Sequence, residues 1–238
     1  MESYASGMPQ GTYHHGDLRR ALLAAAVEAI TESGPAALSL RDLARRAGVS
    51  HAAPTHHFGD KAGLLTALAA EGFDLLAGAL TAVPADRDTF LDVGVAYVRF
   101  AVEHRAHFEV MFRPDLYHAD DPELVAARAR SGAALYGGVA AAARPASAPA
   151  APAASAGPAA PAASAGPAAP AASAGPAAAA RRPEPGDRDR AVREAGLAAW
   201  SLAHGFATLW LSGALPADLG DDPDAAARAI LRRFPPAV

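Results

Sequence analysis

The sequence predicts an all-α protein with a small N-terminal head and a larger helical body. Outside the middle of the chain, large apolar side chains recur every three or four residues, which is the spacing of a helix buried along one face. No stretch alternates apolar and polar residues over the length of a β-strand. Capping residues precede the apolar stretches and Gly or Pro follows several of them, as at the ends of helices.

Short polar side chains that favour the N-cap position stand directly before most of the expected helices. These N-cap candidates are Asp17, Ser39, Ser50, Asp60, Asp88, Asp121 and Asp222. Asp42 follows Ser39 by three residues and completes the pattern of a capping box. The helices are then expected at about 18–33, 40–47, 51–58, 60–80, 88–102, 108–112, 122–143, 187–212 and 223–234.

A repeat interrupts the helical pattern. The nine residues PAAPAASAG at 149–157 recur at 158–166 and 167–175. They offer only Ala, Pro, Ser and Gly, which cannot bury enough apolar surface to offset the entropy of ordering the chain. We therefore expect residues 144–186 to be a low-complexity disordered linker, inserted between the two parts of the body at 63–143 and 187–234.

The composition excludes several classes of protein. The chain has no cysteine, hence no disulfide, thiolate metal site or cysteine nucleophile. No nucleophile–base pair, phosphate-binding loop or carboxylate pair stands out, so we expect neither enzyme activity nor a cofactor. The first 16 residues lack the pattern of a secretory signal, and we expect a cytoplasmic protein. Residues 195–217 carry no charge and are long enough to cross a bilayer, which leaves a membrane-tethered protein as an alternative.

Residues 40–58 are the most specific part of the sequence. They read as a short helix, a turn in which Gly48 tolerates a positive φ, and a second short helix that starts at Ser50. Val49 is expected to lie between the two helices and to fix their angle. This arrangement is a helix-turn-helix, whose second helix places its N-terminal residues in the major groove of DNA. The less specific interpretation is a helical hairpin in an ordinary core.

The second helix presents side chains that are short or flat enough to reach base edges or phosphates. They are Ser50, His51, Ala52, Thr55 and His56. Ala52 or the methyl group of Thr55 can contact a thymine methyl group, and a His or Thr side chain can hydrogen-bond to a base. The free N–H groups at the start of a helix suit phosphate oxygens.

The surrounding residues make the motif specific. His57-Phe58-Gly59-Asp60-Lys61 leads into a long helix with Leu64 and Leu65, and Tyr13-His-His-Gly-Asp-Leu-Arg19 opens the first helix. Together with residues 39–50, these stretches resemble the N-terminal domain of the tetracycline-repressor (TetR) family of transcriptional regulators, over about residues 17–73. By this resemblance, residues 13–62 are a helix-turn-helix DNA-binding domain.

The resemblance implies a homodimer that binds a palindromic operator in double-stranded DNA, with its recognition helices about 34–36 Å apart. It implies that Lys61 binds a phosphate, that Phe58 packs the head and that His57 lies at the DNA backbone. The expected DNA contacts are therefore Ser39, Arg41, Ser50, His51, Ala52, Thr55, His56, His57 and Lys61. The family commonly has Tyr two residues before His57, whereas this chain has Thr55, which reaches less far.

The C-terminal part carries a second resemblance. Trp200-Ser-Leu-Ala-His204-Gly205 is similar to the Trp-x-x-x-His-Gly signature of one class of C-terminal domain attached to such heads. This implies that the last two helices form a dimer interface and that an unknown small-molecule effector binds in the body and releases DNA, as in a repressor. We expect the pocket to be lined by Tyr97, Phe100, Met111, Phe112, Trp200 and His204. The alternative is that these residues are plain core and that His204 is a packing histidine.

The charge of the head leaves one further alternative open. Residues 1–61 contain six basic and six acidic side chains, so the whole net charge of −4 lies downstream. Binding DNA then requires the basic groups to gather on one face, with an affinity that falls steeply with salt. The alternative is an all-helical small-molecule-binding protein or enzyme whose head no longer binds DNA. His104 and His107 have a metal-binding spacing but no identifiable third ligand.

Overall fold

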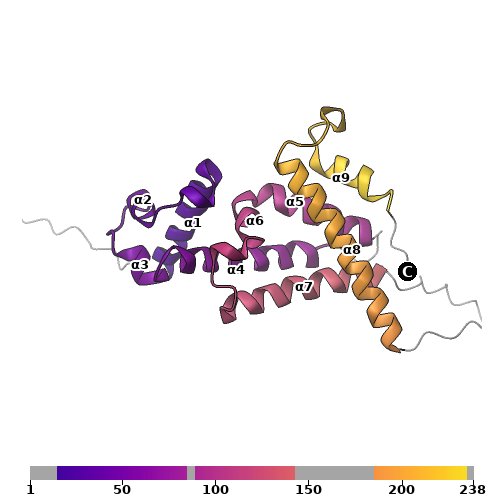
Figure 1. Cartoon of the computed structure of the whole chain (residues 1–238), viewed down its shortest axis with the longest axis horizontal. Coiled ribbons are helices and arrows are strands. Elements are labelled where there is room, and N and C mark those ends of the chain that lie inside the picture. Colours follow the sequence, from indigo (N-terminus) through magenta and orange to yellow (C-terminus); the bar gives the residue numbers. More distant parts are fainter. Residues whose placement is uncertain (1–14, 85–88, 143–184, 235–238) are drawn as a thin grey trace, which may run out of the picture.

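The computed structural model describes residues 15–84, 89–142 and 185–234, and every regular element in these ranges is a helix. The predicted all-α fold is confirmed. Figure 1 shows a head of short helices at one end of an elongated molecule and a body of longer helices at the other. The head contains α1 (His15–Ser33), a short 3-10 turn at Pro35–Ala37, α2 (Leu40–Arg46) and α3 (Ala53–Phe58).

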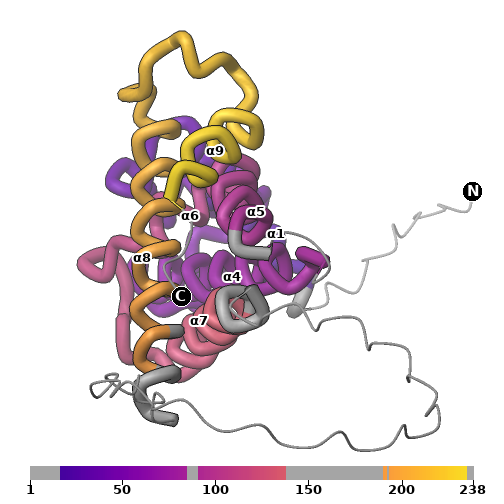
Figure 2. Tube along the Cα trace, turned by 90° about the vertical axis from the view of Figure 1, so that its right-hand side faces the viewer, coloured from indigo at the N-terminus to yellow at the C-terminus, as the bar shows by residue number. Residues whose placement is uncertain are grey.

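The body is reached through α4 (Lys61–Thr81), which runs out of the head. The remaining elements are α5 (Thr89–Glu103), α6 (Arg105–Met111), α7 (Pro122–Ala142), α8 (Pro185–Leu211) and α9 (Pro223–Leu231), with 3-10 turns at Pro114–Leu116 and Ala217–Leu219. The most extensive packing is between α4 and α7, while α5 packs on both α8 and α9. In Figure 2, α4 and α7 are seen nearly end-on and α8 runs across them along one side of the body.

The helix α4 belongs to two parts of the core at once. Its first half contributes Leu64, Leu65 and Leu68, which are fully buried, as is Leu43 from the head helix α2. Its second half contributes further buried side chains that face the body: Phe73, Leu76 and Leu80. Because one continuous helix supplies both sets, the head is joined to the body by a rigid rod and not by a flexible linker.

Three of the predicted N-caps are confirmed by hydrogen bonds. The Asp60 carboxylate accepts from the backbone N–H of Gly63 at 2.7 Å. Asp121 accepts from two backbone N–H groups at 3.0 and 3.1 Å at the start of α7, and Asp222 accepts from two at 2.9 and 3.2 Å at the start of α9. In both of the latter, Pro follows the cap, where its missing N–H costs no helical hydrogen bond.

Some other predicted helix starts are wrong. The helix α1 begins at His15, two residues before Asp17, and the Asp17 carboxylate pairs with Arg20 at 3.0 Å. Ser39 is the N-cap residue of α2, which begins at Leu40 as predicted, although the Ser39 side chain makes no capping bond. Ser50 does not cap a helix, because α3 begins only after Ala52. The capping box is wrong as well, since the Asp42 carboxylate is occupied by arginines of its own helix.

Some of the predictions concern residues outside the described ranges. Residues 143–184, which include nearly all of the expected linker, and Asp88 lie outside the described residues. The last two residues of the expected linker, Pro185 and Gly186, belong to α8.

The alternative of a membrane span at residues 195–217 is not supported by the helix boundaries. The helix α8 ends at Leu211, and Gly213 follows with a φ of 69° that turns the chain. Within the described ranges, α4 is the helix that is long and apolar enough to cross a membrane, and 56% of its apolar window is buried inside the protein. A core helix meets the same criteria of length and composition.

Two glycines of α4 give a matched test of this packing. A Cβ at Gly72 would lie 2.6 Å from Met111 Sδ and 3.0 Å from His107 Cβ on α6, whereas a Cβ at Gly78 would meet nothing within 4 Å. We expect Gly72→Ala to lower the free energy of unfolding by about 1–2 kcal/mol through overpacking. Gly78→Ala should raise it by about 0.5–1 kcal/mol, because alanine favours the helix. Urea unfolding measures both, and equal effects of the two substitutions would contradict the close approach of α4 and α6.

Candidate nucleic-acid interface and ligand pocket

The turn between α2 and α3 has the geometry of a helix-turn-helix. Gly48 ends α2 with a φ of 66°, a conformation that glycine adopts without strain. The backbone N–H of Val49 then donates to the Ala44 carbonyl at 3.0 Å, which closes the turn. The Val49 side chain is partly buried and packs against the core, as expected for a residue between the two helices.

The outer face of α3 and of the turn before it is exposed. Ser50, His51, Ala52, Thr55 and His56 are all exposed, whereas Pro54 is the buried residue of α3. His57 is partly buried, and its ring lies edge-on to that of His56 at 5.6 Å between centroids. These exposed side chains lie on a surface that points away from the core, as the sequence predicts. This surface lies at the end of the molecule far from α8 and α9 (Figure 1).

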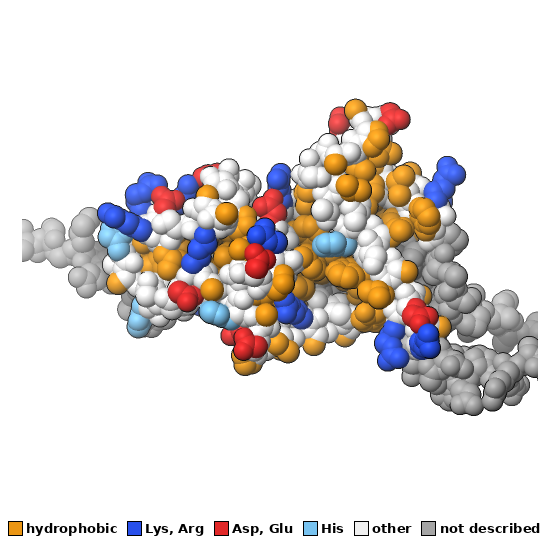
Figure 3. All heavy atoms as spheres, in the orientation of Figure 1, with side chains coloured by type: hydrophobic (Ala, Val, Ile, Leu, Met, Phe, Trp, Pro, Cys, Tyr) orange, Lys and Arg blue, Asp and Glu red, His pale blue; other side chains and the backbone are white. Residues whose placement is uncertain are grey.

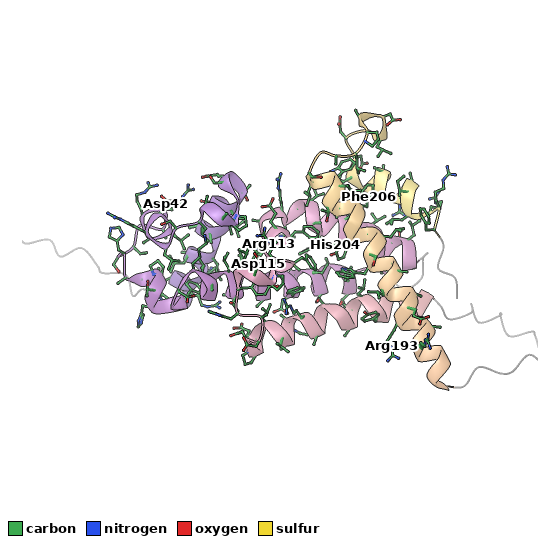
Figure 4. The ribbon with its side chains drawn as sticks, in the orientation of Figure 1. Asp42, Arg113, Asp115, Arg193, His204 and Phe206 are labelled. Atoms are coloured by element: carbon green, nitrogen blue, oxygen red, sulfur yellow. The ribbon has the colours of Figure 1, made fainter. Side chains whose placement is uncertain are left out.

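Acidic side chains neutralise part of the positive charge of the head. Arg46 donates to both Glu32 oxygens, at 2.7 and 3.0 Å, and to Asp42 at 2.7 Å, and so joins α1 to α2. Asp42 also accepts from Arg45 at 2.6 Å. These hydrogen bonds lower the pKa of Glu32 and of Asp42 from their usual values, so both stay charged. Figure 3 shows basic and acidic side chains mixed over the surface of the head, and Figure 4 labels Asp42 there.

Ser39 and two cations complete the expected interface. Ser39 and Arg41 are exposed, and Arg41 has no carboxylate partner among the described residues. The Lys61 ammonium donates to the Ala36 carbonyl at 2.9 Å, which uses one of its three N–H donors and leaves two. Phe58 packs against the core of the head, and the Arg19 guanidinium lies 5.6 Å from its ring centroid.

The body contains an apolar cavity of about 220 Å³ between α4, α5, α7 and α8. Aromatic rings form much of its wall, and the cavity reaches the surface at Tyr136 and Leu197, whose exposed fractions are 38% and 52%. The lining residues are Phe73, Leu76, Leu80, Tyr97, Phe112, Arg128, Ser131, Gly132, Leu135, Tyr136, Leu197 and Trp200.

A chain of hydrogen bonds orients three polar aromatic groups beside this cavity. The Trp200 indole N–H donates to the Tyr97 hydroxyl at 3.2 Å, and that hydroxyl lies 2.9 Å from His204 Nδ1. Since the tyrosine oxygen accepts from Trp200, its own proton is directed to Nδ1, and the neutral His204 carries its proton on Nε2. Burial raises the pKa of Tyr97 and lowers that of His204, so both groups are neutral at pH 7. Figure 4 shows His204 on the side of α8 that faces the rest of the body.

Comparisons with known proteins agree with both halves of this geometry. The family model described as "Bacterial regulatory proteins, tetR family" matches residues 22–68. A second model, "Tetracyclin repressor-like, C-terminal domain", matches residues 90–234, which is more than half of the chain. The chain belongs to the TetR family of transcriptional regulators. No protein with a curated description matches it.

Solved structures agree with this assignment. A protein of unknown function from Rhodococcus sp. RHA1 is 32% identical, with a TM-score of 0.62 over 94% of this chain and 97% of the other. The TetR family regulator PfmR from Thermus thermophilus is 19% identical, with a TM-score of 0.53 over 88% and 93% of the two chains. A tetR-family regulator from Streptomyces coelicolor is also 19% identical, with a TM-score of 0.52 over 92% and 90%. The last two share the fold.

The structure brings together some of the predicted pocket residues of this TetR family protein. Tyr97, Phe112 and Trp200 line the cavity. His204 contacts all three, with its ring centroid 4.5 Å from that of Phe112 and 5.4 Å from that of Trp200. Phe100 and Met111 are each 1% exposed and lie in the core without lining this cavity.

The α7 wall of the cavity, which includes Arg128, Ser131 and Leu135, is not among the pocket residues predicted from the sequence. A signal was present, because Leu124, Arg128, Ser131 and Leu135 recur at intervals of three or four residues and therefore share one face of a helix. An arginine on the apolar face of a helix indicates a special environment.

The two histidines with metal-binding spacing have other contacts. His104 and His107 have ring centroids 5.8 Å apart, and His107 Nε2 lies 3.4 Å from a Glu71 oxygen. Over residues 15–84, 89–142 and 185–234, no three potential metal-ligating side chains come together.

The lowered pKa of His204 makes stability depend on pH. The folded protein takes up a proton at this ring less readily than the unfolded chain does. The contribution of the neutral His204 ring to the free energy of unfolding is therefore complete above about pH 6.5 and is lost as the pH falls below that value. We expect the Tm of the wild type to fall more between about pH 7.5 and pH 5 than the Tm of His204→Gln, whose amide oxygen can still accept from Tyr97. Thermal unfolding checks this, and parallel curves would contradict the neutral, buried state of His204.

Proposed function

We propose that this TetR family regulator is a ligand-responsive repressor that binds a palindromic operator in double-stranded DNA as a homodimer. The observation that carries the proposal is the exposed recognition surface on α3 and its turn, which no other described part of the chain covers. Ser50, His51, Ala52, Thr55 and His56 form this surface, and each is short or flat enough to approach a base pair. Such a regulator acts in the cytoplasm, where its DNA is.

Phosphate binding would come from a small number of groups in each head. Arg41 and Lys61 flank the recognition surface, and neither pairs with a carboxylate among the described residues. Arg45 and Arg46 are held by acidic side chains and contribute less. With about two phosphate-binding cations in each head and two heads, the slope of log affinity against log salt is about −4.

The outer face of α8 supports a dimer. Ser201, Thr208, Leu209 and Ser212 are exposed along it, and Leu209 is 47% exposed although its side chain is large and apolar. A Cβ at Gly205, on the same face, would meet nothing within 4 Å of its own protomer. A small-residue face with an unburied leucine suits close packing against the same helix of a second copy, which would set the spacing of the two heads.

The apolar cavity supports a response to a small molecule. Its wall includes Phe73 and Leu76 from α4 and Phe112 at the end of α6. The helix α6 also packs against α1 in the head, and α4 begins at the recognition domain. A ligand that binds one arrangement of these helices better than another would shift the population of head spacings and thereby release DNA.

The decisive experiment is a gel-shift titration of the full chain with the DNA upstream of its own gene. We expect a discrete complex whose affinity falls about a hundredfold between about 50 and 200 mM salt. A complex that random DNA of the same length competes away equally well would contradict operator recognition. Absence of any complex at the lower salt concentration would favour the alternative of a small-molecule-binding protein whose head no longer binds DNA.

Substitutions in the head separate phosphate binding from sequence recognition. Lys61→Ala should weaken the binding of every DNA sequence by a similar factor and make the salt slope shallower by about 2 in the dimer. His51→Ala should instead change the relative affinities of operator variants, by about tenfold at the base pair it contacts. Arg193→Ala is the control, because this exposed arginine lies on α8 at the far end of the molecule (Figure 4). Identical behaviour of the two head variants would contradict their assigned roles.

The dimer surface has its own test. Leu209→Arg should convert the protein to monomers, because it places a charge on the exposed α8 face, and should weaken operator binding by more than tenfold. Analytical ultracentrifugation measures the oligomeric state. The control is Val125→Arg on α7, because Val125 is 50% exposed, much like Leu209, and lies outside that face. A Leu209→Arg protein that still forms dimers would place the interface elsewhere.

A further inference from the structure

Arg128 is the charged residue in an otherwise apolar cavity wall. Its side chain is partly buried, and its guanidinium carbon lies 5.5 Å from the ring centroid of Phe73 and 5.3 Å from that of Tyr117. Its Nη2 donates to the Tyr117 hydroxyl, which in turn donates to the Met111 carbonyl at 2.7 Å. The guanidinium is therefore held in one position by two rings and by a hydroxyl that is itself anchored.

No carboxylate neutralises this charge among the described residues. Six other arginines of the body each pair with a carboxylate: Arg99, Arg105, Arg113, Arg130, Arg190 and Arg228. Among the side chains that the structure describes, the other body arginines without such a pair are exposed to water: Arg193, Arg232 and Arg233. Arg128 differs from both groups because it is partly buried and still lacks a counter-charge. A buried charge is costly unless an anion pairs with it.

The guanidinium also has hydrogen-bond donors left over. Of its five N–H groups, one donates to Tyr117 and one makes a long contact of 3.5 Å with the Ala119 carbonyl. The Ser131 hydroxyl, beside it in the wall, donates to the Arg128 carbonyl at 3.0 Å and supplies no negative charge. Tyr97 and His204 are neutral as described above. The cavity as a whole therefore presents one positive charge with free donors.

The size and lining of the cavity limit the body of a ligand. A cavity of about 150 Å³ lined by aliphatic and aromatic side chains holds benzene. The volume here, about 220 Å³, leaves room for one aromatic ring and a short substituent. Phe73, Phe112 and Trp200 offer flat faces for such a ring.

We propose that the cavity binds a small aromatic monocarboxylate, with the ring among Phe73, Phe112 and Trp200 and the carboxylate paired with Arg128. The planar fork of a guanidinium matches a carboxylate with two parallel hydrogen bonds. A single positive charge matches a monoanion, whereas a phosphate dianion would leave one negative charge unpaired between apolar walls. The inference rests on the proposed function in one respect: an aromatic monocarboxylate would be the effector that releases the repressor from DNA.

The test compares three probes of one size that differ in charge: benzoate, neutral benzamide and cationic benzylamine. Binding to the full chain is measured by isothermal titration. Fluorescence quenching is measured in a Trp210→Phe background, so that the signal comes from Trp200, which lines the cavity. We expect benzoate to bind at least about tenfold more tightly than benzamide, which is the usual gain from a hydrogen-bonded charge, and benzylamine to bind least. Equal binding of benzoate and benzamide by the wild type would overturn the proposal.

Two variants two residues apart on α7 locate the effect. Arg128→Gln should abolish the preference for benzoate and leave the binding of benzamide unchanged. Arg130→Gln is the matched control, because Arg130 pairs with Asp74 at 2.7 Å outside the cavity, and it should keep the preference. Retention of the preference in Arg128→Gln would also overturn the proposal. If Arg128→Gln does not fold, Arg128→Lys replaces it, with a reduced preference expected because lysine lacks the planar fork.

The two proposals fail in different ways. Operator binding without a ligand is measured in the same preparations. If operator DNA is bound but benzoate is not preferred, the ligand class is wrong and the regulator stands. If benzoate is preferred in an Arg128-dependent way but no DNA is bound, the ligand class stands and the repressor does not.

Discussion

The 21-residue helix α4 is the constraint on which the rest of the structure depends. The head completes its core with Leu64, Leu65 and Leu68 of this helix, while the same helix gives the body Phe73 and Leu76. At Gly72, between these two sets, the α4 backbone lies in contact with Met111 and His107 of α6. A larger side chain there would separate the two helices. The recognition domain and the cavity therefore share one packed element, so that a change in either is felt along a common helix.

A second connection returns from the body to the start of α4. In the turn before α7, the backbone N–H of His118 donates to the Thr66 hydroxyl at 3.0 Å, and His118 Nε2 lies 3.6 Å from the Asp60 carboxylate. Asp60 is also the cap of α4, and its bond to the Gly63 N–H is the main cause of its lowered pKa. Tyr117, next to His118, holds Arg128 in the cavity wall. One short segment thus contacts both Arg128 of the cavity wall and the first turn of α4, beside Lys61.

The sequence predicts those features that depend on local chemistry. The caps Asp60, Asp121 and Asp222 and the turn at Gly48 require only neighbouring residues, and all are found as expected. The capping box at Ser39 and the cap at Ser50 are not found, because the Asp42 carboxylate accepts from Arg45 and Arg46 and α3 begins only after Ala52. The cavity depends on which faces of four distant helices meet. Spacing along the chain could therefore not distinguish the lining residues Tyr97, Phe112 and Trp200 from the core residues Phe100 and Met111. For the same reason it did not indicate that Arg128 lines the cavity.

The internal neutralisation of the head by Glu32 and Asp42 has a consequence for a protein that must find one site in a genome. Attraction to arbitrary DNA comes almost entirely from unpaired cations, and every chromosome offers a vast excess of arbitrary sequence. In this head, the charge of Arg46 serves to hold α1 to α2. The regulator proposed above would therefore lose little of its population to the wrong sequences, and discrimination would fall to the exposed side chains around His51.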